Sequence, residues 1–372
     1  MKVAFFFGAL NRGGAETLAL DVLRRHESLP FGVVCLYRND GVLSEQMAAT
    51  GARMLRIPRK RSWLVYIWRL CRAIRANDIS IVHAQTSLNA ILAIVCSWFT
   101  GVRVVTTFHG FGFVGAPWVL RRFIFRGSDR VVFVSEGLKS AFVERGVFGC
   151  EGKLAVVHNG IDFGKLSIRV ASPVEDTTGA TSGEDGIRMC MVGSFGDGRN
   201  HLLVCRFLRL LKEEGVAFHF TFVGAARPKE MELYDECVRY CSEQGLEKEV
   251  TFAGLRDDVP EILSRMDAFV YSTRHDSFGL AVIEAIACGV PTFVNDWCTM
   301  REITQEGRWA TLYKSDDEES LLGVFKDFLS HREEYEAKAR KSAYEVRDTY
   351  SIESHIGALD SLYRGILECE NS

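Results

Sequence analysis

Short runs of β-branched and aromatic residues alternate with longer amphipathic segments along most of the chain. The runs have the length of strands, whereas segments 15–26, 63–76 and 87–100 have the apolar period of helices. Strands that are apolar throughout are typical of a parallel sheet covered by helices on both faces. The predicted strands of the first half begin at Val3, Phe31, Ile79, Val102, Arg130 and Leu154.

The alternation stops once and then starts again. Residues 166–186 are rich in Ser, Thr, Gly, Asp and Glu, which predicts a linker or a mobile loop. A charged helical tail closes the chain from Asp317 to about Cys369. The length of 372 residues also favours two domains, so we predict an α/β protein with two doubly wound parallel sheets. The strands after the linker begin at Arg188, Ala217, Glu249, Ala268 and Val290.

Charge is distributed unevenly between the two halves. Residues 1–163 carry 21 Lys and Arg against 11 Asp and Glu, whereas the remainder carries 24 against 37. We therefore expect the halves to face different partners. The 11 cysteines include no C-x-x-C pair, which supports neither a zinc site nor a disulfide framework and favours a reduced, cytoplasmic protein.

No segment is predicted to span a membrane. The start, MKVAFFFGAL, is similar to a signal peptide, but its apolar run is short and NRGGAE follows in place of a cleavage site. We interpret it as a buried first strand. Residues 88–101 are apolar but shorter than the roughly 20 residues that a bilayer requires, and they predict a core helix.

A G-x-G-x-x-G motif lies in VVTTFHGFGFVGAP, at Gly110, Gly112 and Gly115. This spacing is typical of dinucleotide binding. In that fold, however, the motif follows the first strand, and here it follows about the fourth. The other interpretation is a Gly-rich loop after a strand, which would make His109 the residue of interest.

Two motifs in the second half favour a nucleotide-sugar site. MVGSFGDGRNH, residues 191–201, puts a Gly-rich turn before a helix, with Arg199 near the helix start. That arrangement suits a diphosphate, although a surface turn with a solvated Arg would look the same. STRHDSFGLAVIEAIACGVP, residues 272–291, places Asp276 in a loop and Glu284 in an apolar helix. Glu284 needs a polar partner, which could be a sugar diol, an Arg or a neighbouring helix end.

On these motifs the chain resembles the retaining glycosyltransferases of family 4. They have the GT-B architecture of two Rossmann-like domains that face a central cleft. The resemblance covers nearly the full length, and two departures from the family pattern stand out. Asp276 replaces the usual Glu, and Ser194 and Arg199 replace the family's frequent Arg and Lys. The motifs that carry the resemblance are Gly13 to Glu16, His109, VVHNGID at 156–162, the Arg199 loop, and the Asp276–Glu284 block with its EAIACGVP ending.

The resemblance implies an acceptor-side domain at 1–165, completed by a helix at 350–372, and a nucleotide-sugar domain at 187–349. It implies no cofactor and no metal, and the chain contains no Asp-x-Asp. Glu284 would hold the ribose, Arg199 the diphosphate, and Asp276 with His109 the transferred sugar. The implied catalytic residues are His109, Asp276 and Arg199, and the implied donor-binding residues are Gly13, Gly14, Ser194, Arg199, Leu255, Arg256, Phe278, Gly279, Leu280 and Glu284.

A basic stretch in the first half offers a second surface. Residues 53–75 hold eight Arg and Lys and no acid, with aromatic residues at helical spacing, and residues 118–126 are similar. This pattern suits an anionic membrane, although a core helix with a solvated basic face would also give it. No nucleic-acid module is recognised. The cations predicted on the membrane or acceptor side are Arg59, Lys60, Arg61, Arg121 and Arg122.

The resemblance implies sugar transfer from a nucleotide-diphosphate donor to a glycan or lipid-linked acceptor. Cell-surface polysaccharide or glycolipid assembly is the expected setting, in the cytoplasm or at the inner face of the cell membrane. The alternatives are a GT-B-like nucleotide-sugar epimerase and a non-catalytic nucleotide-sugar-binding protein.

Overall fold

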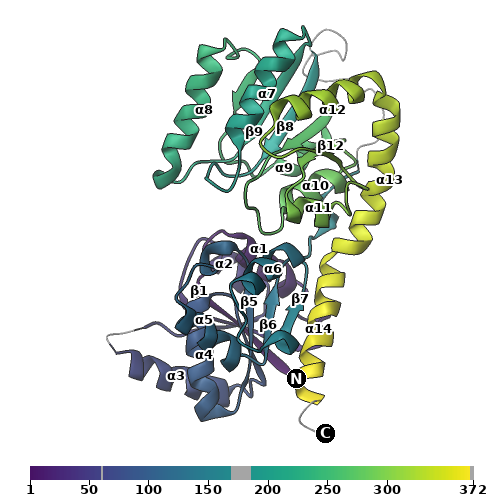
Figure 1. Ribbon diagram of the computed structural model, residues 1–372. Coiled ribbons are helices and arrows are strands. Elements are labelled where there is room, and N and C mark those ends of the chain that lie inside the picture. The colour runs from purple at the N-terminus through teal and green to yellow at the C-terminus, as the bar shows by residue number, and fades with distance from the viewer. Residues whose placement is uncertain (60–61, 169–185, 369–372) are drawn as a thin grey trace. The chain divides into compact units, whose positions relative to one another are not determined.

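The computed structural model describes residues 1–59, 62–168 and 186–368, and this part of the chain forms two compact units (Figure 1). The N-terminal unit comprises Met1–Ile161 together with the chain from Tyr350 onward. The C-terminal unit comprises Asp162–Thr349. Most of the predicted linker, residues 169–185, lies outside the described residues.

The N-terminal unit is built on a parallel sheet with the strand order β3-β2-β1-β4-β5-β6-β7. The apolar N-terminal run is the central strand β1, which pairs Phe5 with Cys35 on one side and with His83 on the other. The prediction of a buried first strand is thus confirmed. The chain order reverses between β1 and β4, which creates a switch point at the carboxyl ends of these two strands. The strands are β1 Lys2–Ala9, β2 Gly32–Asn39, β3 Arg53–Arg56, β4 Ile81–Ala84, β5 Arg103–Phe108, β6 Arg130–Phe133 and β7 Leu154–Val156.

The helices of this unit follow the predicted periodicity closely. The segments 63–76 and 87–100 coincide with α3 and α4. The ends of α4 are well defined because Thr86 caps its start and Gly101 ends it in a left-handed conformation. The helix predicted at 15–26 ends a few residues earlier than expected. The helices are α1 Gly14–Leu23, α2 Ser44–Ala48, α3 Trp63–Ala76, α4 Ser87–Thr100, α5 Trp118–Gly127 and α6 Glu136–Glu144.

The last helix, α14 (Ile352–Glu368), completes the N-terminal core. Its apolar residues recur every three or four positions, and this stripe is buried with residues of α1, β1 and β2. The charged tail that the sequence predicts as one region is therefore three helices, of which α14 belongs to the N-terminal unit. The buried stripe consists of Ile352, Ile356, Leu359, Tyr363 and Ile366.

The C-terminal unit contains a second parallel sheet, in the order β10-β9-β8-β11-β12-β13. Here the order reverses between β8 and β11. The strands are β8 Ile187–Val192, β9 Phe218–Val223, β10 Val250–Phe252, β11 Ala268–Tyr271, β12 Thr292–Asn295 and β13 Thr311–Tyr313. The helices are α7 His201–Glu213, α8 Met231–Glu243, α9 Val259–Ser264, α10 Leu280–Ala287, α11 Cys298–Ile303, α12 Glu318–Ser330 and α13 Arg332–Tyr350.

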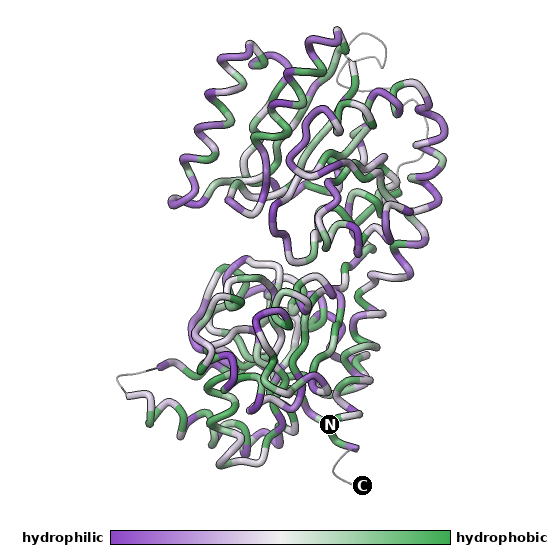
Figure 2. Tube along the Cα trace, in the orientation of Figure 1, coloured by the Kyte–Doolittle hydropathy of each residue, from purple (hydrophilic) through white to green (hydrophobic). Residues whose placement is uncertain are grey.

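Two strands are missing from the sequence-based prediction, and both lie at a sheet edge. β3 has only four residues, and both of its arginines are exposed, so it merges with the basic stretch that follows. β13 has three residues. The long central strands are strongly hydrophobic, as Figure 2 shows. Among the described helices, none is both long enough and apolar enough to cross a bilayer.

Candidate active site

In the C-terminal unit, the two motifs singled out in the sequence meet at the switch point of the sheet. The Arg199 loop follows β8, and the Asp276 loop follows β11, which is the neighbour of β8. The backbone N–H of Asn200 donates to the Ser272 carbonyl at 3.0 Å, and Arg199 pairs with Thr273 in an isolated bridge. Because ligands of open α/β sheets bind beyond the carboxyl ends at such a point, this is the candidate site.

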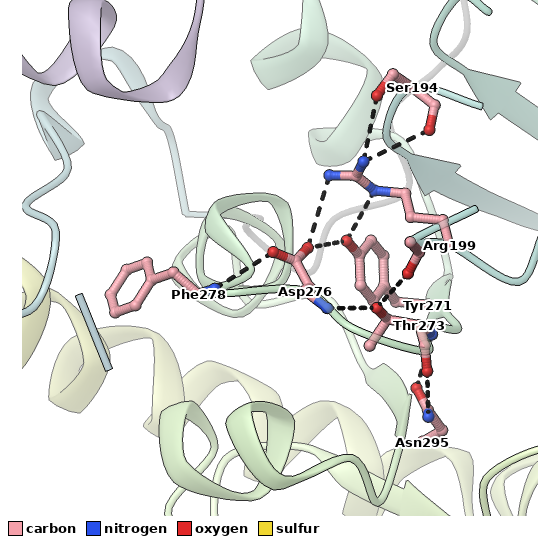
Figure 3. A network of polar contacts seen from close by, with 8 residues as sticks. Ser194, Arg199, Tyr271, Thr273, Asp276, Phe278 and Asn295 are labelled. Atoms are coloured by element: carbon pink, nitrogen blue, oxygen red, sulfur yellow. Dashed lines mark hydrogen bonds and ion pairs between the residues drawn. The ribbon is translucent and has the colours of Figure 1, made fainter. Parts of the chain in front are cut away.

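The Arg199 guanidinium is held by three side-chain oxygens (Figure 3). Its Nε donates to the Tyr271 hydroxyl at 2.9 Å, and its Nη1 donates to Ser194 Oγ at 3.2 Å. Its Nη2 lies 3.6 Å from Asp276 Oδ2. The cation is thus fixed before any ligand arrives, so little side-chain entropy remains to be lost on binding.

Tyr271 links the cation to the acid. Its hydroxyl donates to Asp276 Oδ2 at 2.5 Å while it accepts from Arg199. Burial and the adjacent Asp276 carboxylate raise the pKa of Tyr271 well above its usual range, so the phenol keeps its proton. The direction of the hydrogen-bond chain is therefore fixed, from Arg199 through Tyr271 to Asp276.

Glycines make this packing possible. A Cβ at Gly193 would collide with the Arg199 side chain, and a Cβ at Gly224 would collide with the Gly193 carbonyl. Both glycines also have positive φ, at 159° and 153°. The close approach of the Arg199 loop to the loop after β9 therefore requires glycine at both positions.

Hydrogen bonds from the ends of β11 and β12 hold the Asp276 loop in place. The Asp276 N–H donates to Thr273 Oγ1 at 2.9 Å, and Asn295 on β12 exchanges two hydrogen bonds with the Thr273 backbone. Gly279 then takes φ of 89° and starts α10 at Leu280, where an added Cβ would strike Met300. The loop thus delivers both a carboxylate and the N-terminus of a helix to the same edge of the sheet.

The remaining predicted donor residues differ in their accessibility. Glu284 is partly buried on α10, one to two turns from Gly279. Phe278 is buried, so its side chain cannot line an open site, and its N–H donates to Asp276 Oδ1. Leu255 is exposed after β10, and Arg256 beside it forms a two-bond pair with Asp258 at 2.7 and 2.6 Å.

In the N-terminal unit, the predicted residues also lie beyond the carboxyl ends of strands, at or next to the switch point between β1 and β4. Gly13 caps α1, which begins at Gly14 after β1. His109 follows β5, and its Nε2 lies 2.8 Å from Gln85 Oε1, beyond β4. The Gln85 amide nitrogen donates to the His83 carbonyl, so its oxygen faces His109. This orientation suits the tautomer of His109 with its proton on Nε2, because an amide oxygen can only accept.

Three histidines line a small cavity in the N-terminal unit. The cavity has a volume of about 20 Å³, enough for one water, and is bounded by His83, His109 and His355 among others. His83 is paired at both nitrogens, with Tyr363 Oη and Thr107 Oγ1, each at 2.6 Å. Burial lowers the pKa of His83 to about 3 and those of His109 and His355 to about 4. All three are neutral at pH 7.

The glycines of the G-x-G-x-x-G motif lie in open surroundings. A Cβ at Gly110, Gly112 or Gly115 would meet no atom within 4 Å. The next helix, α5, is entered through Pro117, which has no N–H to offer a phosphate. The geometry favours the loop interpretation over dinucleotide binding, for which glycines permit a close approach of the backbone.

The predicted membrane-side cations divide into three groups. Arg59 and Arg122 are exposed. Arg121 is not available to an outside partner, because it is 8% exposed and its guanidinium lies over the Phe148 ring at 5.5 Å. Its position at the start of an amphipathic helix turns it inward. Lys60 and Arg61 lie outside the described residues.

Sequence reasoning missed several polar residues that hold these sites together, namely Tyr271, Thr273, Asn295, Gln85 and His83. All of them lie in or just after predicted strands, where a polar side chain at the carboxyl end is the available signal. No cluster of three or more potential metal ligands occurs among the residues for which coordinates are described.

Comparison with known proteins gives two family matches. The model described as "Glycosyltransferase Family 4" matches residues 12–165, and the model described as "Glycosyl transferases group 1" matches residues 178–346. The chain therefore belongs to the family 4 glycosyltransferases.

Relatives and solved structures agree with this class. The putative glycosyltransferase EpsF of Bacillus subtilis (strain 168) is 23% identical and covers 97% of this chain and 96% of its own. An Escherichia coli UDP-Gal:alpha-D-GlcNAc-diphosphoundecaprenol alpha-1,3-galactosyltransferase is 23% identical over 74% of each chain. The structure of Anabaena Alr3699/HepE with UDP has a TM-score of 0.85 at 16% identity and covers 98% of this chain and 100% of its own. The fold is thus that of the GT-B glycosyltransferases.

The neutral histidines predict a loss of stability in acid. The pKa of His83 falls from 6.5 when exposed to about 3 when folded, so the unfolded chain binds more protons between these values. The free energy of unfolding should therefore fall as the pH drops below 6.5, by up to about 1.4 kcal/mol per pH unit for this group.

We expect the His83→Gln variant to show a shallower decline between pH 6.5 and 4.5 than the parent. Urea unfolding at several pH values measures both slopes, and folding of the variant is checked at pH 8. Identical slopes would mean that His83 does not contribute to the acid sensitivity.

Proposed function

We propose that this glycosyltransferase moves a sugar from a nucleotide-diphosphate donor to a glycan or lipid-linked acceptor with retention of the anomeric configuration. The observation that supports it is the Arg199 guanidinium, fixed by Ser194, Tyr271 and Asp276 at the switch point of the C-terminal sheet. A prepositioned cation stabilises the charge that develops on a departing diphosphate. UDP and UDP-glucose are the ligands named for the structurally similar HepE.

Other groups take roles in the same proposal. The N-terminus of α10 adds backbone N–H donors near the diphosphate. Glu284 holds the ribose hydroxyls, and residues 255–256 flank the base. Asp276 contacts the transferred sugar from the C-terminal unit, and His109 is assigned to the same sugar. Because His109 is neutral at pH 7, it brings no positive charge to the sugar.

The two departures from the family pattern occur at one place. Asp276 has a shorter side chain than Glu, and the phenol of Tyr271 extends from β11 to meet it at 2.5 Å. Ser194, where the family often has Arg, accepts a hydrogen bond from Arg199. We infer that Tyr271 and Ser194 position the single remaining cation, and that the site operates without a metal ion or cofactor.

The acceptor side of the proposal rests on the relatives. One of them is named for a diphosphoundecaprenol acceptor, which is a lipid carrier. We propose that the protein acts in polysaccharide or glycolipid assembly, in the cytoplasm and at the inner face of the cell membrane. A nucleotide-sugar epimerase and a non-catalytic binder are the alternatives to exclude.

A donor screen tests the reaction. Nucleoside diphosphate release should require both a donor and an acceptor and should persist in EDTA. The new linkage should keep the donor's anomeric configuration, which NMR of the product reports. Sugar conversion without acceptor would identify an epimerase, and binding without release would identify a binding protein. An inverted linkage would contradict the retaining mechanism.

Glu284→Ala tests the ribose contact. The loss of charge-assisted hydrogen bonds should weaken binding of the nucleoside diphosphate by about 1.5–3 kcal/mol, which is about 10- to 150-fold in Kd. Calorimetry measures it, with the exposed Glu232→Ala on α8 as a matched control that should bind like the parent. Unchanged affinity in a folded Glu284→Ala protein would rule out the ribose role.

A further inference from the structure

The helix α3 exposes large apolar residues along its first turns and basic residues along its last turns. Tyr66, Leu70 and Ile74 are buried against the N-terminal unit. On the opposite side, Leu64 is 79% exposed and Trp68 is 60% exposed. A helix of a globular protein normally places polar residues there, so the apolar first turns need a second apolar environment. A uniformly basic outer face therefore does not describe the first turns of α3.

The neighbouring helices extend this surface. Cys96 on α4 contacts the Ile67 carbonyl of α3, and Trp98 on α4 meets Phe123 on α5 edge to face at 5.9 Å. The three helices therefore pack in sequence, α3 on α4 and α4 on α5 (Figure 1). Every exposed tryptophan of the described chain lies on one of them, and they also carry further exposed apolar residues. We call this set the apolar surface: Trp63, Leu64, Val65, Trp68, Trp98, Phe99, Trp118, Val119 and Leu120.

A shallow groove crosses the apolar surface between α4 and α5. It has a volume of about 410 Å³, and both apolar and cationic side chains line it. Trp98 and Val119 contribute the apolar part, and Arg122 and Arg126 contribute the charge. An apolar chain with a nearby anionic group would satisfy both kinds of lining.

The charge of the surrounding chain is one-sided. Residues 46–128 contain twelve Arg and Lys and a single acid, Asp78. Several of the arginines lie beside the exposed rings: the Arg59 guanidinium is 4.6 Å from the Trp63 ring centre, and that of Arg72 is 5.8 Å from the Trp68 ring centre. Such pairs place the rings and the cations side by side. Tryptophan and arginine occur together in this way in protein segments that lie at the boundary between acyl chains and headgroups.

We propose that the apolar surface of α3, α4 and α5 inserts into the headgroup region of the facing leaflet of an anionic lipid bilayer, while the flanking arginines bind the lipid phosphates. Apolar burial supplies one part of the affinity and electrostatic attraction supplies the other. The near absence of acidic residues favours this occupant over a second copy of the chain, because two such surfaces would repel each other. The proposal does not depend on the identity of the donor or on catalysis.

The test is co-sedimentation of the full chain with vesicles of phosphatidylglycerol and phosphatidylcholine, compared with vesicles of phosphatidylcholine alone. The parent should bind the anionic vesicles far better, and added salt should weaken the binding without abolishing it. Brominated acyl chains should quench the tryptophan fluorescence of the bound protein. Absence of binding to anionic vesicles, or of quenching, would overturn the proposal.

Two variants separate the contributions. Leu64→Gln with Trp68→Gln should weaken vesicle binding by about tenfold or more, because two exposed apolar side chains are removed from the insertion. Arg59→Gln with Arg72→Gln should also weaken it, by about tenfold or more at low salt. Val42→Gln, which replaces an exposed apolar residue elsewhere on the same unit, should bind like the parent.

Two outcomes would contradict insertion by this surface. One is parent-like vesicle binding by the Leu64→Gln and Trp68→Gln double variant. The other is a concentration-dependent dimer in the parent that this double variant abolishes, since the apolar surface would then be a contact between copies. Circular dichroism and urea unfolding serve as the folding check for all variants, because every substitution lies in the N-terminal unit.

Discussion

The positioning of one guanidinium organises the C-terminal unit. Arg199 is held by side-chain oxygens from its own loop and from the carboxyl end of β11. Gly193 leaves room for the Arg199 side chain, and Gly224, in the loop after β9, leaves room for the Gly193 backbone. The loop after β11 carries Asp276 and starts α10, so the cation, the carboxylate and the helix N-terminus meet at one edge of the sheet. Each element follows a parallel strand, and the switch point between β8 and β11 brings them together.

The N-terminal unit has a cluster of neutral histidines near its own switch point. It groups three neutral histidines, and the hydrogen bonds of the buried His83 link β4, β5 and α14. The helix α14 thus completes the polar interior as well as the apolar core. His109 is held by Gln85 at the open end of this cluster. The outer helices of the unit combine exposed tryptophans with arginines, whereas the C-terminal half of the sequence is acidic. The division of charge seen in the sequence thus corresponds to two units with different surfaces.

The sequence predicts the parts of the fold that depend on local pattern. Long apolar strands and capped helices such as α4 are readable because the signal lies in consecutive residues. The edge strands β3 and β13 are not predicted, because a strand of three or four residues is too short to show a pattern of apolar and polar positions. The family motif identifies Arg199 and Asp276, but it does not reveal Tyr271, because the role of Tyr271 depends on a contact between β11 and a loop more than 70 positions earlier. Arg121 and Arg122 are adjacent in sequence, and only the packing of α5 shows that one is buried.

The central claim is that Arg199 binds the diphosphate of the donor, and a difference in affinities tests it most directly. Calorimetry should compare the nucleoside diphosphate released in the reaction with its monophosphate, on the parent and on Arg199→Ala. The account predicts that the parent prefers the diphosphate by about tenfold or more, since a charge-assisted hydrogen bond contributes about 1.5–3 kcal/mol. That preference should largely disappear in Arg199→Ala, while monophosphate affinity stays near that of the parent. A full diphosphate preference in a folded Arg199→Ala protein would contradict the account.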